Sequence, residues 1–164
     1  MRPLAELMAT HARAGRIDWI GVRAARRAAM VPLRLAQVTQ AGLAGDHARA
    51  GKRAVTLIQG EHLPVIADLC DGAATPEALR RNLVVSGINL AALKGRAVRL
   101  GMSVIEITGP CAPCSRMEET LGVGGYFAVR HHGGWCARVV DGGEVKLGDA
   151  VEPEGDVLRP GTPE

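Results

Sequence analysis

Glycine is the residue type that most restricts the fold of this chain, because 21 of its 164 residues are glycines spread along the whole length. They divide the sequence into short apolar segments, and turns at such spacing favour a strand-rich fold over a helical bundle. Apolar residues make up 47% of the chain but aromatic residues only 2%, so the core has to be built from aliphatic side chains. The length predicts one domain, large enough to bury a core without a disulfide framework.

The apolar segments between the glycines are the expected strands. Several are apolar at consecutive positions, which indicates that both faces of the sheet are covered. Gly101 and Met102 predict one hairpin connection, and Asp141–Gly143 predicts the turn of a second hairpin. The expected strands are residues 17–23, 33–39, 53–58, 83–85, 98–100, 103–107, 135–140 and 144–147. The predicted fold class is therefore mainly β with inserted helices (α+β), in the form of a mixed β-barrel.

Helices are expected at three places before the middle of the chain. Residues 3–14 predict an N-terminal helix, and residues 61–69 predict a second one with Pro64 in its first turn. Thr75 is a strong N-cap for a third, short helix that has Pro76 at its first position. The predicted organisation is an N-terminal helix at 1–14, a barrel domain at 15–152 and a loose tail at 153–164.

The charge balance argues against some partners. The chain carries 20 Lys and Arg against 17 Asp and Glu, and its net charge of +3 is too small to indicate nucleic acid. The basic run Arg23–Arg27 is interpreted as a solvated face, and one Tyr and one Phe provide no platform for stacked bases. Glu6, His11 and Arg13 interrupt the N-terminal apolar residues, so neither a signal peptide nor a membrane span is expected. We expect a cytoplasmic protein whose four cysteines serve chemistry or packing.

Cys111 and Cys114 are the strongest candidates for chemistry. They lie between an expected strand and a short helix, for which Ser115 is a candidate N-cap and Glu118 completes a capping box. A thiol at this place faces unpaired backbone N–H groups and the positive end of the helix dipole, and Arg116 adds a cation. The thiolate is therefore favoured, and it can attack an electrophile, carry a sulfur or bind a metal.

Other interpretations of these two cysteines stay open. They also fit ordinary core packing, a reversible disulfide, or half of a structural zinc site. A zinc site needs two more ligands, which Cys136, His131 and His132 can supply. Thioredoxin-like redox chemistry is the weaker alternative, because the surrounding sequence lacks the βαβ pattern.

Two other segments carry candidate residues for an anion site. Arg80 and Arg81 end the third helix beside Asn82, and guanidinium groups offer paired donors to phosphate or carboxylate. Either arginine, taken alone, is explained equally well as a cation that stabilises the negative end of the helix dipole at the C-terminus. Asp46 and His47 lie in a glycine-bracketed loop that can present them to a ligand.

The remaining titratable candidates have simpler explanations as well. His131 and His132 precede two glycines and offer a general acid or base near neutral pH, although a solvated loop accounts for them too. Cys70 ends an apolar helix, and Cys136 alternates with outward residues on its strand. Both cysteines are therefore expected in the core.

Six segments occur in an order and spacing that cover roughly residues 15–152. They are GLAGDH at 42–47, RAVTLI at 53–58, RRNLVVSGI at 80–88, LKG at 93–95, GPCAPC at 109–114 and GGEVKLGD at 142–149. Together they resemble the MOSC domain, the family named after the C-terminal domain of molybdenum cofactor sulfurase. Each segment is weak alone, but the ordered set is fairly specific. The resemblance implies a small stand-alone MOSC protein with a β-rich, barrel-like fold.

The resemblance also implies site residues. The family's key cysteine falls within Cys111–Cys114, and Cys114 fits it better because a small polar residue and then a basic residue follow. In larger members that bind the cofactor, this thiolate is a molybdenum ligand and basic residues hold the pterin phosphate. The implied metal ligand is thus Cys114, and the implied catalytic residues are Cys114 and Cys111. The candidate cofactor-binding residues are Asp46, His47, Arg80, Arg81, Asn82, Arg116 and His132.

The leading functional prediction is sulfur carriage or transfer by the Cys114 thiolate, resolved by Cys111, with molybdenum cofactor (Mo-pterin) as the implied cofactor. The alternatives are a non-catalytic module that binds an anionic cofactor and a zinc-stabilised structural domain. The resemblance to the family also implies molybdenum ion binding and pyridoxal phosphate binding. The expected partner is a small anionic ligand or a sulfur-donor protein, and the sequence leaves open whether the chain is an enzyme.

Overall fold

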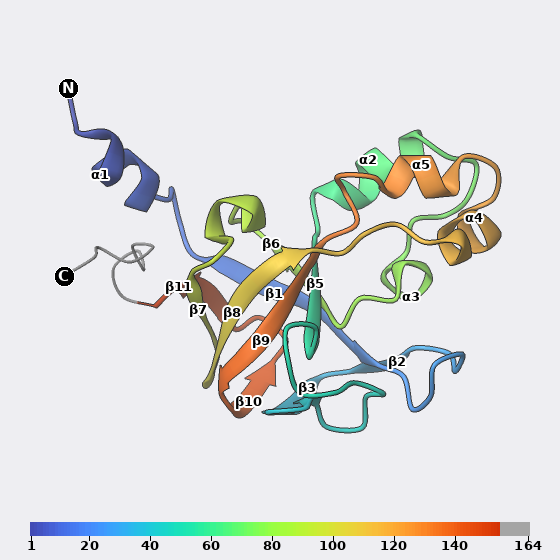
Figure 1. The fold of residues 1–164 in the computed structure, drawn as a ribbon, viewed down its shortest axis with the longest axis horizontal. Helices are drawn as coiled ribbons and strands as arrows, with labels where there is room; N and C mark the ends of the chain where they lie inside the picture. The colour runs from blue at the N-terminus through green and yellow to red at the C-terminus, as the bar shows by residue number, and fades with distance from the viewer. Residues whose placement is uncertain (155–164) are drawn as a thin grey trace.

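The fold is a closed β-barrel with most of its helices gathered at one end (Figure 1). The computed structural model describes residues 1–154. The strands of the main sheet are β1 (Gly15–Val22), β2 (Val31–Leu33), β5 (Val55–Gln59), β6 (Leu83–Ser86), β7 (Ala97–Leu100), β8 (Ser103–Pro110), β9 (Trp135–Asp141) and β11 (Ala150–Pro153). They pair in the order β11-β7-β8-β9-β5-β6-β1-β2, and β1 also pairs with β11, which closes a barrel of seven strands. The predicted mixed β-barrel is confirmed.

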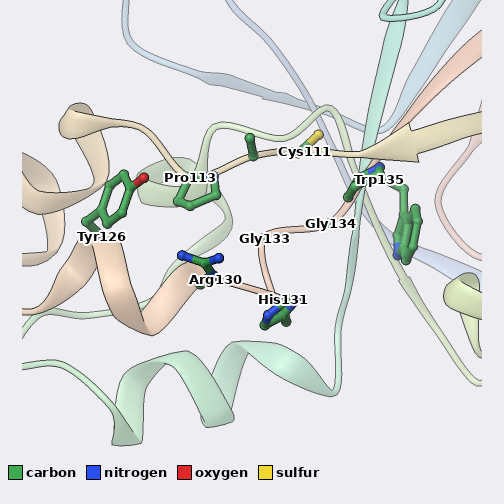
Figure 2. A pocket seen from close by; sticks show the side chains of 10 residues that line it. Cys111, Pro113, Tyr126, Arg130, His131, Gly133, Gly134 and Trp135 are labelled. Carbon is green, nitrogen blue, oxygen red and sulfur yellow. The ribbon is translucent and has the colours of Figure 1, made fainter.

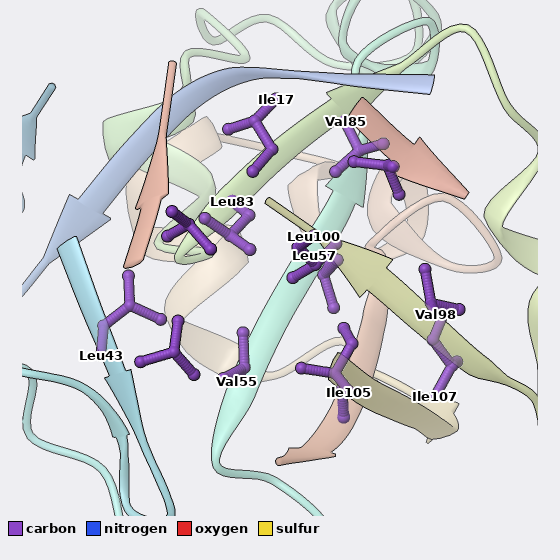
Figure 3. Close-up of a cluster of buried hydrophobic side chains, with 14 of the residues drawn as sticks. Ile17, Leu43, Val55, Leu57, Leu83, Val85, Val98, Leu100, Ile105 and Ile107 are labelled. Atoms are coloured by element: carbon purple, nitrogen blue, oxygen red, sulfur yellow. The ribbon is translucent and has the colours of Figure 1, made fainter. Parts of the chain in front are cut away.

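Aliphatic side chains fill the barrel, as the low aromatic content predicts. Figure 3 shows side chains from strands all around the barrel converging on one another, among them Ile17, Leu57, Leu83, Leu100 and Ile105. Each of these side chains is at most 1% exposed. Burying a side chain of this size contributes about 1.5–3 kcal/mol, so this cluster is the main source of stability for the closed sheet.

A second, smaller sheet corrects one sequence prediction. It consists of β3 (Leu35–Thr39), β4 (Gly42–Leu43) and β10 (Gly143–Lys146), in the order β10-β3-β4. The hairpin predicted at Gly101-Met102 is confirmed as β7 and β8, but the hairpin predicted for 135–147 is wrong. β9 pairs with β8 and β5, whereas β10 pairs with β3. This pairing buries Val145 beside Ala36 in the barrel core, a gain that the local turn signal does not report.

The helical end of the barrel has its own small core. The helices there are α2 (His62–Asp68), α3 (Pro76–Leu79), α4 (Ser115–Leu121) and α5 (Gly125–Val129), and Figure 1 shows them side by side. β5 and β6 are parallel and so need a crossover connection, which α2 and α3 provide. Ile66, Leu79, Met117 and Leu121 of these helices pack into one buried cluster. Thr75 caps α3 as predicted, accepting a hydrogen bond from the Ala78 N–H at 3.1 Å.

Other helical predictions need correction. The N-terminal helix, α1 (Leu4–Ala9), is shorter than predicted and buries no residue, and a helix without a packed face is marginal. Two further elements, α5 and the 3₁₀ helix η1 (Leu90–Leu93), were not predicted. Of the tail predicted at 153–164, Pro153 belongs to β11, and residues 155–164 lie outside the described residues. Within residues 1–154, no helix combines the length and apolarity needed to cross a membrane.

Candidate functional site

The cysteine loop, residues 111–114, leaves β8 and enters α4 at the helical end of the barrel. The Cys111 N–H donates to the Gly134 carbonyl at 2.9 Å, which ties the start of the loop to the segment before β9. Gly134 has a φ of +94°, and a Cβ there would collide with the Leu57 carbonyl oxygen. Only glycine allows this close approach, so the Gly133-Gly134 pair fixes the position of Cys111.

Cys114 is exposed and is itself the N-cap residue of α4. The predicted capping box of Ser115 and Glu118 is therefore wrong by one position. The Glu118 carboxylate instead accepts the N–H groups of Gly124 and Tyr126, both at 2.9 Å. These backbone donors lower the pKa of Glu118 and fix the turn between α4 and α5. The side chain of Cys114 makes no capping hydrogen bond, which leaves its thiol to the cleft described next.

Cys114 opens into a basic cleft. The cleft has two parts of about 700 and 330 Å³, which share five lining residues, Cys114 among them. Nine cationic side chains line the two parts, and Glu119 supplies the one carboxylate found there within residues 1–154. The cations are Arg23, Arg26, Arg27, Arg49, Lys52, Arg53, Arg80, Arg81 and Arg116. The small net charge of +3 thus hides a strongly positive surface around the exposed thiol.

Asp46 and His47, both predicted as site residues, take different places. Asp46 Oδ1 accepts the Arg23 N–H at 2.9 Å, and the His47 N–H donates to the Arg23 carbonyl at 2.7 Å. These two bonds join the 42–47 loop to the start of the basic run. His47 is exposed and lines both parts of the cleft, whereas Asp46 does not line it. Asp46 therefore positions Arg23, and His47 faces the cleft.

Arg80 and Arg116, both predicted to bind the cofactor, lie together in the cleft. Arg80 ends α3 in the left-handed conformation, with φ of 58°, and its Nη2 donates to the Arg26 carbonyl at 3.2 Å. Arg116 donates to the same carbonyl at 3.4 Å. Partial burial, then the charges of Arg116 and Arg23, lower the pKa of Arg80. Crowded cations of this kind are stabilised when an anion binds among them.

Arg81 also lines both parts of the cleft, but the protein uses some of its donors. Its Nε donates to the Gly133 carbonyl at 2.7 Å and its Nη1 to the Leu79 carbonyl at 3.1 Å. Arg81 thus joins the end of α3 to the glycine pair that holds Cys111. The guanidinium of Arg81 therefore adds positive charge to the cleft, while two of its N–H donors are used by backbone carbonyls of the protein.

Asn82 has a structural place instead of the ligand-binding place predicted for it. It is 1% exposed and lies below the cleft, at the start of β6. Its Oδ1 accepts from the backbone N–H and the hydroxyl of Thr56, at 3.0 and 3.1 Å, and its Nδ2 donates to the Gly21 carbonyl at 3.2 Å. Its amide is thus occupied in linking β5, β6 and β1.

Cys111 and Cys136 form a buried thiol pair beneath the cleft. Their Sγ atoms lie 3.2 Å apart. The hydrogen bond from Cys111, together with the nearby Arg53 and Arg81, lowers the pKa of Cys136 to about 6. The same contact and burial raise the pKa of Cys111. Since the two sulfurs interact so strongly, the pair as a unit loses its first proton below the ordinary thiol pKa and holds its second tightly.

A separate cavity of about 460 Å³ lies on the other side of the cysteine loop (Figure 2). Cys111 and Ala112 line both this cavity and the basic cleft, so the loop is the wall between them. Tyr126 and Pro113 lie on one side of the cavity and Trp135 on the other. The lining is more apolar than that of the cleft, and Arg130 is the one Lys, Arg, Asp or Glu residue in it within residues 1–154.

The two histidines of the 131–134 loop do not join the cleft. His131 lines the second cavity. His132, predicted to bind the cofactor, packs instead against His62 of α2, with ring centroids 5.1 Å apart in an edge-on arrangement. In the described part of the chain, no three His, Cys, Asp or Glu side chains come together as a metal site. The mixed zinc site considered from the sequence is therefore not assembled among these residues.

Sequence reasoning missed several residues of the site. The run Arg23–Arg27, interpreted as a solvated face, lines the cleft, and so do Arg49, Lys52 and Arg53. Two clusters of basic residues on either side of the GLAGDH segment were the available signal. Cys136 is buried, as predicted, but its pairing with Cys111 follows only from the register of β8 on β9.

The fold and the site define a class: a closed β-barrel domain that presents an exposed cysteine in a basic cleft. The model of the MOSC domain matches residues 44–152, about two thirds of the chain. The chain belongs to the MOSC domain family. The match includes Cys114, His47, Arg80 and Arg81, whereas the Arg23–Arg27 run lies outside it.

Solved structures share this fold at low sequence identity. The YUAD protein from Bacillus subtilis is 17% identical, with a TM-score of 0.74 over 86% of this chain and 96% of that one. YiiM from Escherichia coli is 21% identical, with a TM-score of 0.67 over 87% of this chain and 71% of that one. YiiM from Geobacillus stearothermophilus is 16% identical, with a TM-score of 0.72 over 86% and 75%. Among curated protein sequences, none matches the chain.

Proposed function

We propose that the basic cleft binds a phosphate-bearing anionic cofactor, and that Cys114 is the residue at which a soft metal or a sulfur attaches. The observation that carries the proposal is the exposed Cys114 thiol within a cleft lined by nine cations. The family is associated with molybdenum cofactor, which combines a phosphate with a soft metal. The proposed ligand is of this molybdenum-pterin kind.

The residues of the cleft suit such a ligand chemically. Guanidinium groups bind phosphate through paired, charge-assisted hydrogen bonds, and a thiolate is a soft ligand. Arg80, Arg116 and His47 would hold the phosphate, and Cys114 would be the ligand of the metal. When bound, the cofactor supplies redox chemistry at the metal.

The other side chains would keep these groups in place. Arg23 is bonded through its backbone to Asp46 and His47, and its Nη1 donates to the Arg80 carbonyl at 2.8 Å. The basic run, the 42–47 loop and the end of α3 are thus connected before any ligand arrives. Such preorganisation lowers the entropic cost of binding.

Sulfur carriage is the second candidate, because Cys114 and its neighbours Ala112 and Ser115 are exposed. A donor protein can therefore approach the thiol from outside. In the transfer, the Cys114 thiolate attacks the terminal sulfur of a persulfide on the donor, a new S–S bond forms on Cys114, and the donor leaves as a thiolate. The cations of the cleft would stabilise both thiolates.

Mass spectrometry under native and then denaturing conditions tests the proposal. The protein is purified from a host that makes molybdenum cofactor, as wild type and as Cys114→Ser. We expect a pterin mass that is present only under native conditions, or an added sulfur that survives denaturation and maps to Cys114. Either should be absent from Cys114→Ser. A wild-type protein with neither, or one that holds a zinc ion, would overturn the proposal.

A further inference from the structure

The buried thiol pair has no role in the proposed cofactor binding, and its geometry suggests one. Cys111 and Cys136 are 7% and 4% exposed, and their Sγ atoms lie 3.2 Å apart. A disulfide bond is about 2.05 Å long, so the two sulfurs need to approach by only about 1 Å. Cys114, in contrast, is exposed and has no cysteine partner among the described residues.

The backbone around the pair is already in place for such a bond. β8 and β9 are antiparallel, with Gly109 opposite Cys136 and Pro110 opposite Trp135. The Cys111 N–H continues this contact to the Gly134 carbonyl at 2.9 Å. On the far side, the Thr108 hydroxyl lies 2.6 Å from the Lys52 carbonyl oxygen and 3.1 Å from that of Cys136. A crosslink here would therefore join segments whose separation is already fixed.

A small oxidant can reach the pair through Cys111. Cys111 lines both the basic cleft and the second cavity, which have volumes of about 700 and 460 Å³ in the parts that meet it. Arg53 and Arg81 lie near the sulfurs and favour a thiolate over a thiol. A nucleophilic sulfur, a partner thiol in contact and an approach from the surface are the components that thiol–disulfide exchange requires.

We propose that Cys111 and Cys136 form a reversible disulfide by exchange with a low-molecular-weight disulfide, and that its formation strengthens anion binding in the cleft. The thiolate of the pair attacks one sulfur of the small disulfide and releases a small thiolate, which leaves a mixed disulfide on the protein. The partner thiol then loses its proton, attacks the protein sulfur of that bond and displaces the second small thiolate. Two protein thiols are oxidised, and one small disulfide is reduced to two thiols.

The link to anion binding follows from charge, and this part rests on the proposed function. The two sulfurs lie 3.2 Å apart, with Arg53 and Arg81 nearby favouring a thiolate in the reduced pair, whereas the disulfide is neutral. Oxidation therefore removes a negative charge from beneath the cleft. We expect the affinity for pyrophosphate to rise by about threefold to tenfold, the range for one unit charge near a partly solvated site. By linkage, pyrophosphate should favour oxidation by the same factor.

Peptide mapping after equilibration in reduced and oxidised glutathione tests the disulfide. After an acid quench and alkylation, we expect peptides joined through Cys111 and Cys136, while Cys70 and Cys114 carry the alkyl label. Cys70→Ser, the matched control, should leave the crosslink intact, and Cys136→Ser should abolish it. Four labelled cysteines at every glutathione ratio, or a Cys111–Cys114 bond, would overturn the inference. The wild-type map is decisive even if a variant fails to fold.

Calorimetric titration of pyrophosphate into the reduced and oxidised wild-type protein tests the coupling. Tighter binding to the oxidised form supports it, and equal affinity for both forms would overturn it. If pyrophosphate binds to neither form, the coupling and the proposed function fail together. The disulfide, which is read from the peptide map, would stand in that case.

Discussion

Replacing Asn82 with alanine should destabilise the barrel without weakening anion binding. The side chain makes three hydrogen bonds in the interior, and its removal leaves the Thr56 N–H and the Gly21 carbonyl without those partners. Each buried polar group left unpaired costs about 1–3 kcal/mol, so the expected loss is about 3 kcal/mol. For a chain of this size, that corresponds to a fall in Tm of about 10 °C.

Thermal and urea unfolding measure this effect, and pyrophosphate titration measures binding. Asn89→Ala is the matched control, because Asn89 is exposed and its Oδ1 accepts one hydrogen bond, from the Ala91 N–H at 3.2 Å. The control should lose about 1 kcal/mol, the typical cost of removing an N-cap side chain. The reasoning would be refuted if Asn82→Ala melted like the wild type and bound pyrophosphate more weakly, because Asn82 would then contact the ligand.

Three further predictions concern the cysteines. Cys114→Ser should abolish cofactor or sulfur loading but change stability by only about 0.5 kcal/mol, since the side chain is exposed; a large loss of stability in melting experiments would contradict this. Iodoacetamide should label Cys114 before the buried Cys111 and Cys136, and peptide mapping that shows the reverse order would contradict the assignment of the site. The contact between the two sulfurs lowers the pKa of Cys136 to about 6 and raises that of Cys111. The first deprotonation of the pair therefore stabilises the folded state between about pH 6 and the ordinary thiol pKa, and this stabilisation is lost as the pH falls through about 6. Urea unfolding of Arg53→Ala should show a smaller loss over that range, whereas Arg34→Ala, at an exposed arginine outside the cleft, should match the wild type.

Local signals were sufficient for those elements whose pairing is local. The Thr75-Pro76 start of α3 and the turn between β7 and β8 depend on neighbouring residues, and both were predicted. Barrel closure pairs Gly15 with Val151, and no short sequence pattern reports a contact of that separation. Asp141–Gly143 was predicted as a hairpin turn because its residue types favour a turn. The sequence does not show that β10 is buried by pairing with β3, which is distant along the chain.

The site shows the same division between local and distant information. The cysteine motif and the paired arginines were recognisable as candidates, and Cys114, Arg80, Arg81 and Arg116 do meet at the cleft. Asn82 looked equally available, because the sequence does not show that its amide is bonded to Thr56 and Gly21. The arginines of the 23–27 run looked solvated because their neighbours in the cleft come from segments that are distant in sequence.

The most direct test of the central claim is calorimetric titration of pyrophosphate into variants of the cleft. Arg27 and Arg49 line its two different parts, and neither side chain makes a hydrogen bond or salt bridge with residues 1–154. Their replacement with alanine should therefore leave the fold intact. Arg34→Ala is the control outside the cleft. We predict that the wild type and Arg34→Ala bind pyrophosphate equally, and that Arg27→Ala/Arg49→Ala binds it at least about tenfold more weakly, a loss of about 1.4 kcal/mol. Equal binding by all three proteins, or no binding by the wild type, would contradict the account.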